Sequence, residues 1–535
     1  MKFASAPQNA IQPRSPQGVY RNESFLDFKA PENVSQMRAA LDEVRSQLGR
    51  EYPLVIGGQR IQTEKKIRSI NPARPAEVVG VHQQAGAAEV EPAMQAALTA
   101  FAGWSRTPVE TRAALLLNAA EAIRQRSFEF RAWLTFEAGK NWAEADADVG
   151  ETIDFLEFYA REALRLAQSE PPIQYPGERC ELHYVPLGVG AIIPPWNFPF
   201  AIMAGMTAAA IVCGNTVVLK PSSDAPTIAA KFMEVLEEAG LPAGVVNFCP
   251  GSGASFGNAL VEHPKTRFIS FTGSKAVGLE IHEKAAKTQP GQIWIKRTVL
   301  EMGGKDSILV CADADLDAAA DAVIASAFGF SGQKCSACSR AIIEASVYDA
   351  FEQKLVERAA KLTVGDPAEN HNLGPVVNAA ALKSILGYIA KGRQEGRLIA
   401  GGNAPKTAEE GYFVEPTIVA DIAPNAVLAQ EEIFGPVLAL IKVASFEEGL
   451  QVANNTEYGL TGAIWSSDRR KLDIARHEFH VGNLYFNRKC TGAMVGAHPF
   501  GGFNMSGTDS KAGGPDYLLL FTQAKSVAEK HCMQM

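Results

Sequence analysis

The sequence predicts an α/β protein whose parallel sheets are covered by helices on both faces. Two observations support this prediction. Short apolar runs alternate with helical segments from about residue 185, and a second alternating series begins near residue 305. Apolar strands that alternate with helices are typical of parallel sheets buried on both faces. At 535 residues the chain is too long for one core, so two or three domains are expected.

The two series can be divided into elements. The apolar run at 189–193 predicts a strand, and the small-residue run at 200–214 predicts a helix that stops at Gly214 and Asn215. An amphipathic helix at 225–240 also ends in glycine. The remaining segments follow the same patterns, with strands at 216–220, 244–248, 267–273, 306–310 and 339–345, and helices at 315–329 and 347–362.

The two ends of the chain differ from this pattern. The first 50 residues are polar and contain several prolines, and they become helical near 33–49. The segment 518–530 predicts a terminal strand. A strand of this kind often pairs with another subunit, so we expect it at an interface.

Composition and charge exclude several classes of partner. The net charge is −8 and no basic cluster occurs, which argues against nucleic acid and anionic membrane surfaces. The uncharged stretch from Val185 to Leu219 is long enough to span a bilayer. It contains PPWNFP at 194–199, which breaks any helix there, so we predict a strand, a loop and a buried helix.

The eight cysteines have no framework spacing and predict free thiols in a reducing compartment. The first sixteen residues lack the apolar core of a secretory signal, so we expect a cytoplasmic protein. The segment is basic and poor in acidic residues, so a transit peptide is the alternative.

Cys335 and Glu301 are the strongest candidates for chemistry. Cys335 lies in FSGQKCSACSR (330–340), and Glu301 lies in LEMGGK (300–305). Glycines beside each residue let the backbone turn sharply and let a ligand approach closely. A nucleophilic thiol with a separate carboxylate base is a design for covalent catalysis, here the formation and hydrolysis of a thioester.

Other interpretations remain open for the same residues. Cys335 would equally serve as a buried inert thiol, and Glu301 as a solvated acid. With Cys338 the cysteine forms a CxxC, the pattern of zinc and redox sites, but no second ligand pair follows at a suitable spacing. The run HEFH (477–480) lacks further ligands, so we assign no metal.

A nucleotide site is indicated by FTGSKAVG (271–278), which follows an apolar strand and opens a helix. The N–H groups and the positive dipole end of such a helix suit a pyrophosphate. The alternative is that Ser274 only caps the helix. Lys220 ends a buried strand, where ligands of α/β proteins bind, although a solvated lysine would fit there too. The run GSGASFG (251–257) departs from the GxGxxG fingerprint.

Five motifs occur in a characteristic order: PWNFP (195–199), FTGS (271–274), LEMGGK (300–305), GQKCSACSR (332–340) and EEIFGPV (431–437). In this order and spacing the chain resembles the aldehyde dehydrogenase superfamily from about residue 50 to 525. The resemblance implies that Cys335 is the nucleophile and Glu301 the general base that activates water. It also implies that the Asn197 amide donates to the oxyanion, whereas the alternative role of Asn197 is to satisfy its proline-rich loop.

The resemblance implies a Rossmann-type NAD-binding domain, an α/β catalytic domain and a small β oligomerisation element. The expected boundaries are an N-terminal arm at 1–50, the NAD-binding domain at 51–300 with an oligomerisation hairpin near 170–186, the catalytic domain at 301–490, and a C-terminal segment at 491–535 that returns to the oligomerisation and NAD-binding region. A homo-oligomer, a dimer or larger, is expected.

The resemblance also assigns the cofactor, NAD, to a set of residues. Lys220 would bind the adenine ribose, Ser274 would lie near the pyrophosphate, and Glu432 would hold the nicotinamide ribose beside Phe434. Ser223 stands where many NAD-preferring relatives carry a Glu, and its neutral hydroxyl would also tolerate the 2′-phosphate of NADP. The full set is Ile193, Trp196, Lys220, Ser222, Ser223, Gly253, Phe271, Gly273, Ser274, Glu432 and Phe434.

Three further runs, 328–340, 479–496 and 498–515, are similar to the 1-pyrroline-5-carboxylate dehydrogenases of this superfamily. This implies NAD-dependent oxidation of L-glutamate γ-semialdehyde to L-glutamate in proline degradation. We expect Gly513 and Gly514 to form a backbone nest for the substrate carboxylate, with an ordinary turn as the alternative. The other expected substrate residues are Ser336 as a hydroxyl donor, Phe198 and Phe521 as an aromatic sandwich, and Glu151 facing the amine.

Two other functions remain possible on sequence grounds. The first is a hydrolytic aldehyde dehydrogenase that acts on another carboxylated semialdehyde. The second is a former enzyme that has lost its activity and serves as a binding or structural protein, which the presence of Cys335, Glu301 and Asn197 opposes. The resemblance disfavours a CoA-acylating relative, because that class commonly lacks the base that Glu301 would supply. In every case we expect a small-molecule ligand and neither nucleic acid nor membrane as a partner.

Overall fold

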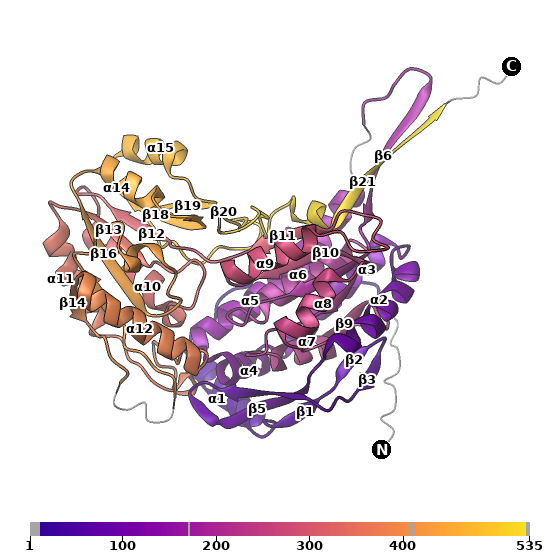
Figure 1. Cartoon of the computed structure of the whole chain (residues 1–535), viewed down its shortest axis with the longest axis horizontal. Coiled ribbons are helices and arrows are strands. Elements are labelled where there is room, and N and C mark those ends of the chain that lie inside the picture. The colour runs from indigo at the N-terminus through magenta and orange to yellow at the C-terminus, as the bar shows by residue number, and fades with distance from the viewer. Residues whose placement is uncertain (1–10, 169–171, 406–410, 531–535) are drawn as a thin grey trace.

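The computed structural model describes residues 11–168, 172–405 and 411–530. Two seven-stranded sheets dominate the molecule and lie in two adjoining lobes (Figure 1). Helices cover both sheets, as the alternation of apolar runs and helical segments predicted. The fold class predicted from the sequence is confirmed.

The first sheet uses strands from the first 301 residues. Five of its strands, from β11 at one edge to β9, are parallel to one another. At the other edge, β2 pairs antiparallel with β9, and β3 pairs antiparallel with β2. In spatial order the strands are β11 (Arg297–Glu301), β10 (Thr266–Thr272), β7 (Val189–Ile193), β8 (Thr216–Leu219), β9 (Val246–Phe248), β2 (Leu54–Ile56) and β3 (Gln59–Ile61).

The second sheet uses strands between residues 307 and 486. All its neighbouring strands are parallel except β14, which pairs antiparallel with β15 at one edge. In spatial order they are β14 (Arg397–Ala400), β15 (Thr417–Ala420), β16 (Val437–Val443), β13 (Arg340–Glu344), β12 (Ser307–Val310), β18 (Thr461–Trp465) and β19 (Asn483–Phe486).

The helices divide between the two lobes. Those associated with the first lobe are α1 (Pro31–Arg45), α2 (Val90–Trp104), α3 (Val109–Gln125), α4 (Ser127–Ala138), α5 (Trp142–Ala167), α6 (Ala201–Val212), α7 (Thr227–Glu238), α8 (Asn258–Glu262) and α9 (Lys275–Ala286). Those of the second lobe are α10 (Leu316–Phe328), α11 (Tyr348–Ala359), α12 (Ala379–Glu395), α13 (Val427–Gln430), α14 (Phe446–Asn454) and α15 (Arg469–Glu478).

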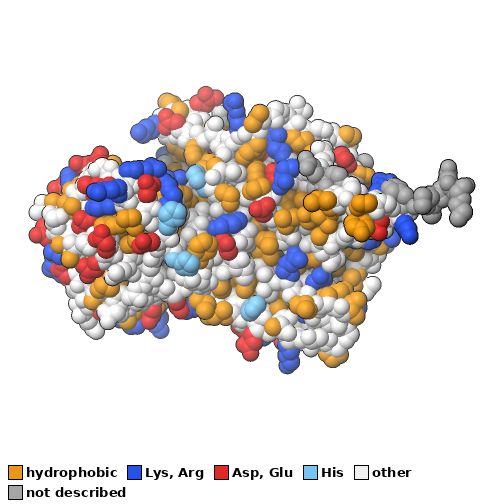
Figure 2. Space-filling view, turned by 90° about the horizontal axis from the view of Figure 1, so that it is seen from above, with side chains coloured by type: hydrophobic (Ala, Val, Ile, Leu, Met, Phe, Trp, Pro, Cys, Tyr) orange, Lys and Arg blue, Asp and Glu red, His pale blue; other side chains and the backbone are white. Residues whose placement is uncertain are grey.

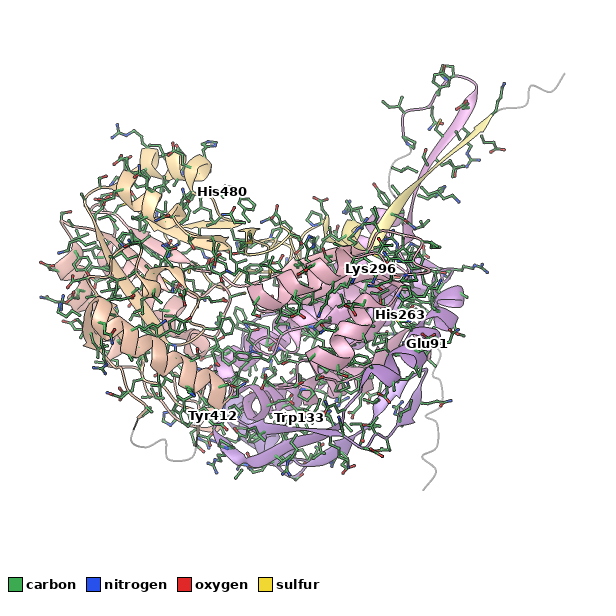
Figure 3. All side chains as sticks on the ribbon, viewed as in Figure 1. Glu91, Trp133, His263, Lys296, Tyr412 and His480 are labelled. Carbon is green, nitrogen blue, oxygen red and sulfur yellow. The ribbon has the colours of Figure 1, made fainter. Side chains whose placement is uncertain are left out.

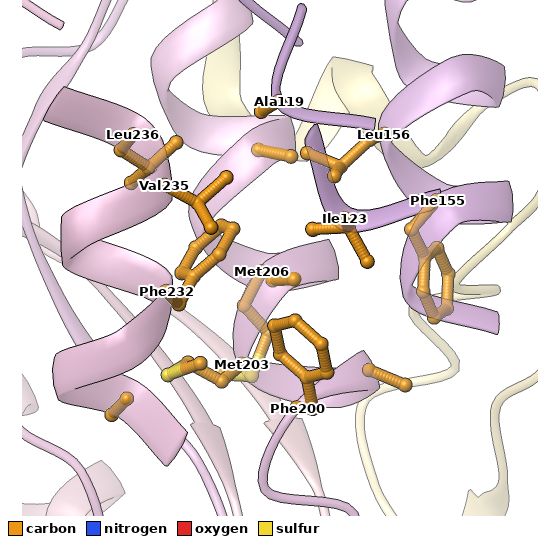
Figure 4. Packing of buried hydrophobic residues seen from close by; sticks show 14 of the residues in the cluster. Ala119, Ile123, Phe155, Leu156, Phe200, Met203, Met206, Phe232, Val235 and Leu236 are labelled. Atoms are coloured by element: carbon orange, nitrogen blue, oxygen red, sulfur yellow. The ribbon is translucent and has the colours of Figure 1, made fainter. Parts of the chain in front are cut away.

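The core of the first lobe explains why the uncharged stretch near residue 200 is buried. Helix α6 is packed on nearly every side, because its alanines and glycine let neighbouring helices approach closely. Ile123 of α3, Leu156 of α5, Met203 of α6 and Phe232 of α7 meet in one cluster (Figure 4). None of the helices within the described residues combines the length and apolarity that crossing a bilayer requires.

The parallel strands of the first sheet converge on one edge. Strand β7 ends at Ile193, β10 at Thr272 and β11 at Glu301, and Lys220 directly follows β8. The register pairs Phe271 with Ile193 and Thr272 with Glu301, so these strand ends are neighbours. Ligands of open parallel sheets bind at this edge.

Smaller sheets complete the fold. A three-stranded sheet contains β1 (Arg50–Tyr52), β5 (Arg74–Gln83) and β4 (Lys66–Asn71), and a short pair joins β17 (Tyr458–Gly459) to β20 (Phe503–Asn504). The predicted terminal strand is β21 (Thr522–Lys530), but its partner, β6 (Glu178–Pro186), belongs to the same chain. Together they form a two-stranded arm that projects from the body (Figure 1).

Surface charge shows no segregation on the face in Figure 2, where acidic and basic side chains are interspersed with apolar ones. This distribution agrees with the modest net charge of −8. It gives no extended basic footprint of the kind that nucleic acid requires on this face.

Candidate active site

The loop that carries Cys335 has an unusual backbone. After α10, Phe330 and Ser331 take positive φ angles of 49° and 54°. The Ser331 hydroxyl donates to the Gly374 carbonyl at 2.7 Å. Gly332 has φ of 68°, and a Cβ there would lie 2.2 Å from the Gly435 carbonyl oxygen, so only glycine fits. Such strain persists only where surrounding contacts fix it, and here they fix the position of the thiol.

Gln333 connects this loop to Asn197 of the first lobe. The Asn197 side-chain amide donates to the Gln333 carbonyl at 3.0 Å. The Gln333 amide is itself buried and bonds Val377 N at 2.8 Å and the Pro375 carbonyl at 3.2 Å. An amide nitrogen carries two hydrogens, so one Asn197 N–H is left for an oxygen atom bound beside Cys335.

Glu301 ends β11 and is buried, with a relative exposure of 9%. One carboxyl oxygen accepts the Ser510 hydroxyl, and the other has no hydrogen-bond partner within the described residues. Burial raises its pKa to about 8, although the Ser510 hydroxyl and backbone N–H oppose the shift. A carboxyl group with this pKa can exchange a proton near neutral pH.

The Cys335 thiol is partly exposed, whereas Cys338 is buried. Enclosure of the thiol, with Asp306, Glu432 and Glu301 nearby, raises the pKa of Cys335 well above its ordinary value. The backbone N–H of Ser336 opposes that shift. The group is therefore a thiol in the ligand-free protein, and a positive charge or proton acceptor must assist its ionisation.

The two cysteines of the CxxC, Cys335 and Cys338, have different surroundings. The Cys338 thiol hydrogen-bonds Cys490, and all cysteines in the described residues are free. No group of three His, Cys, Asp or Glu side chains in those residues could hold a metal ion. His480 lies in the second lobe (Figure 3), where its ring packs 5.0 Å from that of Phe503.

A first cavity of about 600 Å³ opens on one side of Cys335. Its volume lies in the range of small-molecule and cofactor sites. Every residue predicted for the cofactor lines it, namely Ile193, Trp196, Lys220, Ser222, Ser223, Gly253, Phe271, Gly273, Ser274, Glu432 and Phe434.

Local contacts in this cavity refine the individual predictions. Lys220 donates to the Pro221 and Gly251 carbonyls at 3.2 Å, and burial lowers its pKa to about 8. Ser274 caps α9, because its hydroxyl accepts from Val277 N at 3.5 Å. Of the two roles considered for this hydroxyl, capping is the one seen in the structure. The N-terminus of α9 nevertheless faces the cavity, because Gly273, Ser274 and Val277 all line it.

Glu432 and Phe434 approach from the second lobe. Gly304 N donates to the Glu432 carboxylate at 3.1 Å, and burial raises the Glu432 pKa to about 7. The Phe434 ring meets Trp196 edge-on at 5.5 Å. These residues fit a dinucleotide, since the N-terminal end of helix α9, a lysine and a carboxylate line one cavity.

A second cavity of about 450 Å³ opens on the other side of Cys335. Glu301 lines it, as do the predicted substrate residues Glu151, Phe198 and Ser336. Burial, and then the neighbouring Asp148, raises the pKa of Glu151 to about 8. The two cavities share only Thr272 and Cys335 among their lining residues. The thiol therefore lies where a bound aldehyde and a bound dinucleotide would meet.

Three predicted substrate residues lie away from this cavity. The Gly513 N–H donates to the Tyr159 hydroxyl at 2.8 Å, and the Gly514 N–H donates to the Lys511 carbonyl at 2.9 Å. Both donors of the predicted nest are thus already used within the protein. Phe521 is fully buried, with its ring 5.5 Å from Phe268 and 5.2 Å from Tyr517. The prediction for Gly513, Gly514 and Phe521 is corrected accordingly.

The structure instead brings the loop 491–495 to the cavity. Within the described residues, the backbone N–H groups of Gly492 and Ala493 have no hydrogen-bond acceptor. Gly492 has φ of 75°, and the Lys489 ammonium lies 3.4 Å from where its Cβ would be. Free N–H groups beside a cation form an anion site. In the sequence, Gly492 was the only feature of the loop 491–495 that could have indicated an anion site.

Two ion pairs lie at or near the wall of this cavity, one of them partly exposed and the other fully buried. Lys334 pairs with Glu144 at 2.7 Å, and Lys140 pairs with Asp148 at 3.1 Å in full burial. The Lys140 ammonium also lies 3.9 Å from the centre of the Phe198 ring. A buried pair that loses one partner leaves an uncompensated charge, so each pair fixes its neighbours strongly. Sequence reasoning did not identify these pairs.

Comparison with known proteins agrees with the geometry. A sequence model of the Aldehyde dehydrogenase family matches residues 60–527. A 1-pyrroline-5-carboxylate dehydrogenase of Geobacillus thermodenitrificans is 59% identical over 511 residues, which cover 95% of this chain and 99% of that protein.

Solved structures give the same grouping. A 1-pyrroline-5-carboxylate dehydrogenase from Thermus with bound NAD superposes with a TM-score of 0.95 at 51% identity, covering 97% of this chain and 100% of that one. Proline utilization A from Bdellovibrio bacteriovorus has a TM-score of 0.95 at 44% identity, covering 98% of this chain and 54% of that longer one. The chain belongs to the aldehyde dehydrogenase family.

Proposed function

We propose that this protein oxidises L-glutamate γ-semialdehyde, the open form of 1-pyrroline-5-carboxylate, to L-glutamate with NAD as the acceptor. The observation that carries the proposal is the position of Cys335 between two cavities, one lined by Glu301 and one suited to a dinucleotide. The names of the relatives, 1-pyrroline-5-carboxylate dehydrogenases at up to 59% identity, support the choice of substrate.

In the first half of the reaction, Cys335 loses its thiol proton to solvent, its sulfur bonds to the aldehyde carbon, and the carbonyl π electrons move onto the oxygen, which becomes negative. The remaining Asn197 N–H donates to that oxygen, and the backbone N–H of Cys335 adds a second donor. The residues that line the first cavity would hold the dinucleotide, which would supply the acceptor for a hydride from that carbon. Cys335 would then carry the acyl group as a thioester.

In the second half, Glu301 takes a proton from a water molecule as its oxygen attacks the thioester carbon. The carbon–sulfur bond breaks, the acid forms, and Cys335 regains a proton. The Glu301 oxygen without a partner is the atom placed to hold that water, because the other oxygen accepts from Ser510.

The α-carboxylate of the substrate would bind the free N–H groups of Gly492 and Ala493, with the Ser336 hydroxyl and the Lys489 ammonium adding to the site. Lys334 contributes less charge, since Glu144 pairs with it. Glu151 lines the same cavity and would face the α-ammonium, whose positive charge would favour its ionised form.

NAD is the expected cofactor, and NADP is expected to work less well. Ser223 offers a neutral hydroxyl to a 2′-phosphate, but the Asp224 carboxylate lines the same cavity. Two like charges in proximity oppose binding. Calorimetric titration of both dinucleotides measures this preference without turnover.

Activity is tested by following NADH absorbance with 1-pyrroline-5-carboxylate, with succinate semialdehyde and with propanal. We expect the highest kcat/KM for 1-pyrroline-5-carboxylate, because its open form is the only one of the three aldehydes that carries both a carboxylate and an amine. Equal kcat/KM for succinate semialdehyde would favour the alternative, a dehydrogenase of another carboxylated aldehyde. Equal values for propanal would contradict recognition of the carboxylate altogether.

We also propose that the chain forms a homo-oligomer through the arm of β6 and β21. A two-stranded ribbon is marginally stable alone, and the adjoining loop exposes Ile173 at 97% and Tyr175 at 68%. Light scattering of the wild type and of Ile173→Asp/Tyr175→Asp tests this, since the variant should dissociate. An unchanged mass would contradict the assignment.

A cytoplasmic location is proposed on the free thiols, because oxidising compartments favour disulfides. Separation of the cellular compartments and activity measurement in each fraction tests the location. Activity outside the cytoplasmic fraction would refute it.

A further inference from the structure

The segment 20–28, here called the N-terminal strap, lies outside the residues 60–527 that match the family model. It nevertheless reaches the aldehyde cavity, because Glu23, Phe25 and Leu26 line that cavity together with Cys335. The strap therefore adds to the site a wall that the family's shared sequence does not encode.

Buried carboxylates of α5 hold the strap in place. Asp154 accepts from Glu23 N and from the Asn22 amide, both at 2.8 Å, and Asp146 accepts from Leu26 N at 2.8 Å. Both carboxylates also line the aldehyde cavity. Charge-assisted hydrogen bonds of this length are about twice as strong as neutral ones, so the strap is fixed at both ends of its cavity-facing part.

The strap also contacts the loop that carries the anion site. The Asn22 amide donates to the Val495 carbonyl at 2.9 Å, and the Glu23 carboxylate pairs with Arg124 of α3 at 2.6 Å. At its start, the Tyr20 ring packs edge-on against Phe158 at 5.3 Å. The strap thus bridges α5 and the loop 491–495, two elements that both line the aldehyde cavity.

Two apolar side chains of the strap, Phe25 and Leu26, line the aldehyde cavity. Leu26 is half-buried, whereas Phe25 is 61% exposed. An exposed phenyl ring beside a ligand cavity lacks the packing that would normally bury it. Phe25 therefore lines the cavity where the cavity meets solvent.

We propose that Phe25 and Leu26 of the strap determine chain-length specificity, closing the outer end of the cavity to aldehydes longer than a five-carbon semialdehyde. This deepens the proposed function by assigning its size limit to a segment outside the family match. A short aldehyde reacts at Cys335 without reaching the strap, while a long one must displace it.

The test compares propanal with octanal in the double variant Phe25→Ala/Leu26→Ala, which enlarges the outer end. The matched control is Arg21→Ala/Ser24→Ala, which alters exposed strap residues that do not line the cavity. We expect the octanal-to-propanal ratio of kcat/KM to rise roughly tenfold in the first variant and to stay constant in the control. A ratio that is unchanged or lower, or an equal rise in the control, overturns the proposal.

Hydrogen exchange of the wild type provides a second measurement if the variant does not fold. Saturating octanoate, the acid that octanal oxidation would yield, should accelerate exchange at residues 22–26, because the long chain displaces the strap. Unchanged exchange there while the loop 491–495 is protected overturns the proposal. If the wild type oxidises propanal but not 1-pyrroline-5-carboxylate, the proposed function is refuted and the proposal on chain length is not. The chain-length test compares only propanal with octanal and does not use 1-pyrroline-5-carboxylate.

Discussion

Burial of Glu301 makes the hydrolysis of the thioester sensitive to pH. Its pKa is raised to about 8, so the carboxyl is neutral at low pH and becomes a base as pH rises through that value. At pH 7 roughly a tenth of the molecules carry the ionised form, and at pH 9 roughly nine-tenths do. Where hydrolysis limits turnover, kcat should therefore rise roughly tenfold between these two values.

Glu301→Gln tests the origin of this rise. The amide fills the same space and cannot accept a proton, so NADH should form in a single burst while steady turnover falls by about a hundred- to ten-thousand-fold and loses its pH dependence. Stopped-flow absorbance at several pH values measures both phases. Ser510→Ala provides a graded comparison, because loss of a donor to the carboxylate should move the midpoint upward.

Two results would refute this reasoning. The first is steady turnover in Glu301→Gln at the wild-type rate, which would remove the base from the mechanism. The second is a wild-type profile that is flat from pH 6 to 9 although the burst shows hydrolysis to be limiting. In that case the carboxyl would retain a pKa near its ordinary 4.5, and burial would not control it.

Four other predictions follow from the site. Cys335→Ala should abolish NADH formation but retain dinucleotide binding, as fluorescence titration would show; residual turnover would contradict the nucleophile. Asn197→Ala should lower kcat about a hundred- to a thousand-fold with little change in KM, and an effect confined to KM would oppose an oxyanion role. Gly492→Val should raise KM for 1-pyrroline-5-carboxylate about tenfold but not for propanal, because the side chain enters the anion site. Ser223→Glu should weaken NADP binding more than NAD binding by calorimetry, and equal losses would exclude contact with the 2′-phosphate.

The sequence located the reacting groups because their motifs are locally distinctive. Cys335 and Glu301 are flanked by glycines that regular structure disfavours, and the apolar strands around them follow the alternation of a parallel sheet. The strand ends then fall at one edge of the sheet by topology alone. For these residues, local pattern and global fold point to the same place.

The substrate end was harder to predict, because backbone donors have no one-letter signature. Gly513 and Gly514 resemble a nest in sequence, yet Tyr159 of α5 takes the Gly513 N–H. The corresponding free donors belong to Gly492 and Ala493. Their N–H groups stay free because no acceptor from a distant segment of the described chain packs against them, and this cannot be seen in the sequence. Contacts between remote segments, like those of the strap with Asp154, cannot be inferred from spacing along the chain.

The two cavities on either side of Cys335 open to solvent at different places. Exposed Ser223 lies on the rim of one, and exposed Phe25 and Gly492 lie on the rim of the other. The acid product can thus leave through the opening of the aldehyde cavity, while the reduced dinucleotide is still bound in the other cavity. The two ligands therefore reach solvent past different residues, although both cavities meet at Cys335.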